Sequence, residues 1–82
     1  MTAQPIISRV ANVFHEAFAV PAEGITNQTV PDDVPKWDSL GHMNMVSVLE
    51  KEFGLQFEID EIMEMASVQN ILDVLARKGI KD

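Results

Sequence analysis

The sequence predicts an all-α fold, a four-helix bundle with a long loop between the first and second helices and a short third helix. In several segments apolar residues recur at steps of three and four, the period of an amphipathic helix. Glycines and prolines separate these segments. The segment 55–59 alternates weakly, but one short strand would have no partner to pair with. Helices packed on helices are therefore expected.

The first helix is expected over about residues 5–18. Pro5 suits the first turn of a helix, where its missing N–H is not needed. The apolar positions that follow define one face of this helix: Ile6, Ile7, Val10, Val13, Phe14, Ala17 and Phe18.

A long loop is expected over residues 19–37, where the helical period breaks and prolines and a glycine accumulate. A loop of about nineteen residues is unusual in a compact domain and is often functional. Its apolar residues are expected to hold it against the core: Val20, Ile25, Val30, Val34 and Trp37.

The second helix is expected over about residues 39–53 and ends at Gly54. At 100° per residue, one face forms the core stripe, made of His42, Met45, Val46, Leu49 and Phe53. The residues that fall largely outside this stripe are Ser39, Leu40, Met43 and Ser47.

The last two helices are shorter. A third fits residues 60–65. A fourth fits residues 68–78, with Ser67 as its N-cap and Gly79 just past its end. Its apolar stripe consists of Val68, Ile71, Leu72 and Leu75.

The composition limits the function. The chain has 82 residues and begins with Met1, which predicts a complete small protein with a single domain over 1–82. The net charge of −7 argues against a nucleic-acid partner. There is no cysteine for a disulfide or a thiolate metal site, no apolar run that would insert into a membrane and no signal-peptide pattern. A soluble, cytoplasmic monomer is expected.

The start of the second helix is the candidate functional site. Asp38 can be its N-cap and Ser39 its first residue, and Ser39 can serve capping alone or carry a phosphate. Leu40 and Met43 lie beside Ser39 on the more exposed side, as ordinary surface residues or as a docking spot.

Catalytic and metal-binding readings find little support. A Ser39–His42 nucleophile–base pair lacks an orienting third group. No metal site is expected. The spacing of the two histidines matches no zinc motif, and the acidic residues Glu58, Asp60, Glu61 and Glu64 match no calcium loop.

Three segments together resemble the acyl carrier protein family, whose members carry phosphopantetheine. They are W-D-S-L at 37–40, M-V-S-V-L-E-K-E-F-G at 45–54 and A-S-V-Q-N-I at 66–71. The resemblance implies that Ser39, next to Asp38, carries 4'-phosphopantetheine donated from coenzyme A. The thiol of that arm would hold acyl or aminoacyl intermediates as thioesters, and the chain itself would be non-catalytic.

The resemblance also implies partners and a place for the cargo. A phosphopantetheinyl transferase would load the arm, and acyl-loading, condensing or transferring enzymes would use it. The second helix would be the recognition surface, through Leu40, Met43, Asn44, Ser47 and Glu50. The acyl chain would lie between helices, lined by Met45, Val46, Leu49, Phe53, Met65 and Leu72.

This chain departs from the acidic pattern common in fatty-acid-synthesis carriers. Gly41 and Asn44 occupy places where acids are common, and Lys51 separates Glu50 from Glu52. Trp37 is also less typical of those carriers. A specialised lipid, polyketide or related pathway is therefore favoured. The alternative function is an unmodified helical interaction module with a carrier-like fold.

Overall fold

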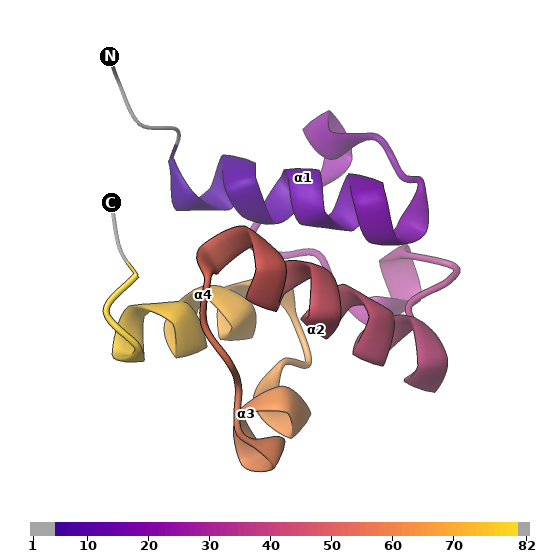
Figure 1. The fold of residues 1–82 in the computed structure, drawn as a ribbon. Coiled ribbons are helices and arrows are strands. Elements are labelled where there is room, and N and C mark those ends of the chain that lie inside the picture. The colour runs from indigo at the N-terminus through magenta and orange to yellow at the C-terminus, as the bar shows by residue number, and fades with distance from the viewer. Residues whose placement is uncertain (1–4, 81–82) are drawn as a thin grey trace.

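The structure is a computed structural model that describes residues 5–80. Four α-helices follow one another along the chain: α1 Ile6–Phe18, α2 Ser39–Phe53, α3 Ile59–Glu64 and α4 Val68–Arg77. Two short 3₁₀ turns, η1 Ala22–Gly24 and η2 Pro31–Asp33, lie in the long loop. The described residues contain helices and no strand, so the predicted all-α fold is confirmed (Figure 1). The predicted domain, 1–82, includes residues 1–4 and 81–82, which lie outside the described residues.

The helix boundaries agree closely with the sequence prediction. α2 has the predicted bounds. α1 begins one residue later than predicted, because Pro5 stands just before it. α3 begins and ends one residue earlier, and α4 ends one residue earlier. Differences of this size are usual for helix ends, which fray.

Local capping explains these boundaries. The Asp38 carboxylate accepts a hydrogen bond from the Gly41 N–H at 2.8 Å, and the Ser67 hydroxyl accepts one from the Asn70 N–H at 3.1 Å. Gly54 ends α2 with φ of 65°, a left-handed conformation that suits glycine. The predicted caps are confirmed.

The core forms where α1, α2 and α4 meet the end of the long loop. Phe14 lies edge-on to Phe18 and to Trp37, with ring centroids 5.4 and 4.9 Å apart. Along the predicted stripe of α2, Met45, Val46 and Leu49 are buried, whereas His42 and Phe53 at its two ends are half-buried. In the predicted stripe of α4 Leu72 is likewise half-buried, and Val74, which lies outside that stripe, is fully buried.

The long loop is held to the core mainly as predicted. Val34 and Trp37 are buried, and Val20 and Ile25 are half-buried against the core. The prediction for Val30 is wrong, because its side chain is exposed. Its N–H bonds the Asp33 carboxylate at 3.1 Å, so main-chain contacts fix the loop at this position.

The same loop also caps α4. The first two N–H groups of α4, from Val68 and Gln69, donate to the carbonyls of Thr29 and Asn27 at 2.9 and 3.0 Å. These N–H groups have no partner inside their own helix. The loop therefore supplies the hydrogen-bond acceptors that the N-terminus of α4 lacks, and it is held against that helix.

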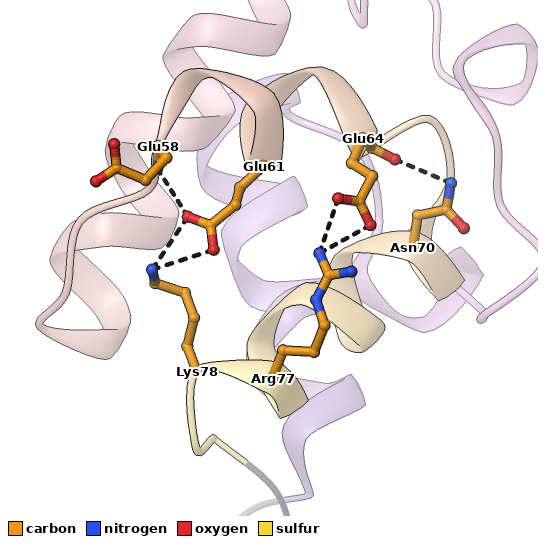
Figure 2. Close-up of polar contacts among 6 residues, drawn as sticks. All are labelled: Glu58, Glu61, Glu64, Asn70, Arg77 and Lys78. Carbon is orange, nitrogen blue, oxygen red and sulfur yellow. Dashed lines mark hydrogen bonds and ion pairs between the residues drawn. The ribbon is translucent and has the colours of Figure 1, made fainter.

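α3 is fastened to α4 by ion pairs. The Lys78 ammonium lies 3.0 Å from the Glu61 carboxylate, and the Arg77 guanidinium lies 2.8 Å from Glu64 (Figure 2). The Asn70 amide also donates to the Glu64 carbonyl at 2.9 Å. A helix of six residues is too short to be stable alone, so these contacts hold it in place.

None of the helices within residues 5–80 has both the length and the hydropathy that crossing a membrane requires.

Candidate functional site

Ser39 is the first residue of α2 and is exposed. The Asp38 carboxylate turns back onto the Gly41 N–H, so the cap leaves the Ser39 side chain at the surface. The N-terminus of this 15-residue helix carries a partial positive charge. An anionic group on the Ser39 hydroxyl would thus lie in a favourable field.

An apolar groove of about 580 Å³ opens beside Ser39. We call it the Ser39 groove. It lies between the end of the long loop, the first turns of α2, and α3 with the residues just after it. Its lining residues are Pro31, Trp37, Asp38, Ser39, His42, Met43, Ile62, Met63, Met65 and Ala66. A groove of this character can cover a flexible apolar chain that begins at the serine.

His42 lines this groove and contacts a residue on each side of its ring. The Trp37 indole N–H donates to His42 Nδ1 at 2.8 Å, and His42 Nε2 lies 2.8 Å from the Ile62 carbonyl oxygen. The two rings are nearly coplanar, at 6°, with centroids 6.2 Å apart, which is the geometry of an in-plane hydrogen bond. His42 therefore has a structural partner on each side.

The apolar surface around Ser39 extends over two helices. Leu40 is 86% exposed and Met43 is also exposed, so their predicted exposure is confirmed. On α3, Ile59 and Met63 are exposed as well, Met63 by 78%. They are four residues apart and share one side of α3. The sequence analysis missed them as site residues, although this spacing was a readable signal.

The other three residues predicted to bind partners are Asn44, Ser47 and Glu50, and the side chains of Asn44 and Glu50 make hydrogen bonds within the protein. The Asn44 amide donates to the Ala17 carbonyl of α1 at 3.3 Å, and the Glu50 carboxylate accepts from the Phe57 N–H at 3.0 Å. Ser47 is simply exposed on α2. Asn44 and Glu50 thus have structural contacts, and a role of the three in partner binding stays a prediction.

The residues predicted to line an acyl cavity are dispersed. Of the six, Met65 lines the Ser39 groove. Phe53 is half-buried with the Arg9 guanidinium 4.3 Å from its ring centroid, and Leu72 lines a separate groove with Ile6. The remaining three, Met45, Val46 and Leu49, are buried in the core. Their contact with cargo stays a prediction.

Within residues 5–80, no group of three or more histidine, aspartate or glutamate side chains is placed to hold a metal ion.

The site is thus an exposed serine that opens the second helix of a four-helix bundle, beside an apolar groove. Residues 8–75 match the family described as the phosphopantetheine attachment site. The chain is also 31% identical over 81 residues to an acyl carrier protein of Saccharopolyspora erythraea, a match that covers 94% of this chain and 85% of that relative.

This chain therefore belongs to the acyl carrier protein family. The cofactor of the family is phosphopantetheine. Carriers of this kind are generally non-catalytic and work with biosynthetic enzymes.

Proposed function

We propose that Ser39 carries 4'-phosphopantetheine and that the chain shuttles acyl or aminoacyl intermediates between enzymes. The observation that carries this proposal is the exposed Ser39 side chain at the first position of α2, directly after the Asp38 cap. When bound, the cofactor supplies a terminal thiol on which the cargo is held as a thioester.

The residues around Ser39 fit such an arm. The positive end of α2 suits a phosphodiester on the hydroxyl. The Asp38 carboxylate accepts a hydrogen bond from the Gly41 N–H, and this bond holds it at the N-terminus of α2. Apolar side chains of the Ser39 groove, such as Met43 and Ile62, would shield an acyl chain from water.

The chain itself would be non-catalytic and would act as a substrate of its partners. A phosphopantetheinyl transferase and acyl-loading, condensing or transferring enzymes would dock on Leu40 and Met43, with Asn44, Ser47 and Glu50 around them. We place this activity in the cytoplasm, where coenzyme A donates the arm, and we expect a monomer because the exposed apolar residues of α2 are already assigned to docking.

The charge distribution of α2 supports a specialised lipid, polyketide or related pathway. The chain has a net charge of −7, yet residues 39–49 contain no Asp, Glu, Lys or Arg. Partners would therefore recognise this segment through apolar contact and hydrogen bonds more than through charge. Association with them should depend weakly on ionic strength, since screening acts on charges.

The test is the intact mass of the protein after incubation with coenzyme A and a promiscuous phosphopantetheinyl transferase. Wild type should gain one phosphopantetheine and Ser39→Ala none. Ser47→Ala is the matched control, because it removes another exposed serine of α2 and should be modified like wild type. Absence of modification in wild type would overturn the proposal and favour an unmodified interaction module.

A further inference from the structure

The hydrogen bonds of His42 define the tautomer of its neutral ring. An indole N–H is only a donor, so Nδ1 of His42, which receives the Trp37 N–H, must be the acceptor nitrogen. The proton of the neutral ring is then on Nε2, which donates to the Ile62 carbonyl oxygen at 2.8 Å. One side chain of α2 thus links the long loop to α3. We call this the Trp37–His42–Ile62 relay.

The relay holds α3 through a contact separate from its ion pairs. Lys78 and Arg77 fasten α3 to α4, whereas the Nε2–H of His42 fastens it to α2. The acceptor, the Ile62 carbonyl, lies within the last turn of α3 and receives a longer bond of 3.3 Å from the Met65 N–H. A six-residue helix depends on such outside contacts for its position.

The relay is also part of the wall of the Ser39 groove. Trp37, His42 and Ile62 all line it, together with Ser39. Since Ile62 and Met63 belong to α3, any shift of α3 away from α2 changes the width of this groove. His42 therefore bridges the two helices that border the groove at the attachment site.

We propose that His42, in its Nε2–H form, is a positioning residue that fixes α3 against α2 and so sets the groove available to the acyl chain tethered at Ser39. This inference rests on the proposed attachment at Ser39. Without the relay, α3 keeps its ion pairs to α4 and the core packing of Ile62, but it loses its hydrogen bond to α2. The width of the groove is then less firmly fixed.

The position of α3 is tested on the protein without its arm. Nitrogen NMR of wild type should show the Nε2–H tautomer of His42, and the Nδ1–H tautomer or a mixture would overturn the relay. His42→Gln can still donate to the Ile62 carbonyl, because the Gln amide nitrogen reaches the place of Nε2. His42→Asn reaches only the place of Nδ1 and is the matched variant that keeps just the Trp37 contact.

Amide hydrogen exchange then separates the two variants. The Ile62 and Met65 amides should exchange about fivefold faster in His42→Asn than in wild type, as for the loss of a net hydrogen bond. His42→Gln should stay close to wild type. Equal exchange in Asn and Gln variants would overturn the role of His42 toward α3.

The effect on cargo is tested with the loaded protein. The thioester bonds of the acetyl and octanoyl forms would be cleaved with hydroxylamine, and the rates would be measured. The same thioesters of free pantetheine give the cleavage rate without protein, and protection is the ratio of the two rates. Wild type and His42→Gln should protect the octanoyl thioester more than the acetyl one, and His42→Asn should lose that difference. Equal protection in His42→Asn and wild type would overturn the role in cargo binding.

Failure of Ser39 to accept the arm would instead overturn the proposed function, and amide exchange would still decide the position of α3.

Discussion

The carbonyl oxygen of Lys36 occupies the space that a β-carbon on Gly41 would need. The end of the long loop therefore lies directly against the first turn of α2. The Phe18 ring approaches the same point, at 3.0 Å from that hypothetical atom. Gly41 is thus required by packing, which gives a structural reason for the missing acid at this position. Asn44, the other departure in this part of α2, bonds the end of α1.

Gly41→Ala should lower the free energy of unfolding by about 1–3 kcal/mol, because the added methyl group forces the loop backbone away from α2. Urea unfolding followed by the fluorescence of Trp37, the single tryptophan, measures this. Gly24→Ala is the control, since a β-carbon there meets nothing within 4 Å, and it should leave stability unchanged or raise it by up to about 1 kcal/mol. Equal losses in both variants would contradict the packing argument.

Asp38→Ala should lower the free energy of unfolding by about 1 kcal/mol, because the Gly41 N–H loses its side-chain acceptor. Asp38→Ser should retain most of the stability, since serine caps nearly as well. Phosphopantetheine transfer to both variants separates two roles of Asp38. If transfer to Asp38→Ser fails although its stability is retained, the transferase needs the carboxylate itself, and if transfer succeeds, Asp38 serves as the cap.

Glu61 should make the folding stability of the protein depend on pH. The N–H of Glu58 and then the Lys78 ammonium hold the pKa of the Glu61 carboxyl below its ordinary value of 4.5 (Figure 2). A carboxyl whose pKa is lowered by folding stabilises the protein fully above that ordinary value, and the contribution is lost as the pH falls through the lower, folded pKa. Stability should therefore decline below about pH 4.5.

Thermal melts between neutral and acidic pH check this dependence. Glu61→Gln should be less stable than wild type at neutral pH, and the difference between them should shrink as the pH falls. Glu23→Gln, an exposed change in η1, is the control and should follow the wild-type curve. A constant difference between Glu61→Gln and wild type at every pH would contradict the assignment.

Ala19→Gly should stabilise the protein. Ala19 ends α1 with φ of 59° and ψ of 32°, a left-handed conformation that carries a penalty of about 1–2 kcal/mol for a residue with a β-carbon. Glycine loses about 0.5–1 kcal/mol of that gain through its greater freedom when unfolded. A net rise of about 0.5–1 kcal/mol is expected.

The control for this change is Ala76→Gly inside α4, where the backbone is helical and glycine should lower stability by about 0.5–1 kcal/mol. Opposite signs for the two Ala-to-Gly changes, measured by urea unfolding, are the expected result. A loss in both would show that the conformation of Ala19 is not strained.

Local sequence patterns are enough to predict the helices and the exposed serine. Periodicity and capping act over one or two turns, so the α2 boundaries, the Asp38 cap and the exposed start at Ser39 follow from neighbouring residues alone. The motif segments around Ser39 are likewise continuous stretches of the chain, which is why the order of the residues is enough to show the family resemblance.

The surroundings of that serine depend on how the helices and the loop pack together. Contacts between residues far apart in the chain made the choice: His42 with the Ile62 carbonyl, Val68 with the Thr29 carbonyl, and Lys78 with Glu61. Such contacts depend on how the helices pack, which a helical period does not encode. For this reason the groove beside Ser39 is lined by α3, while Met45, Val46 and Leu49 fill the core.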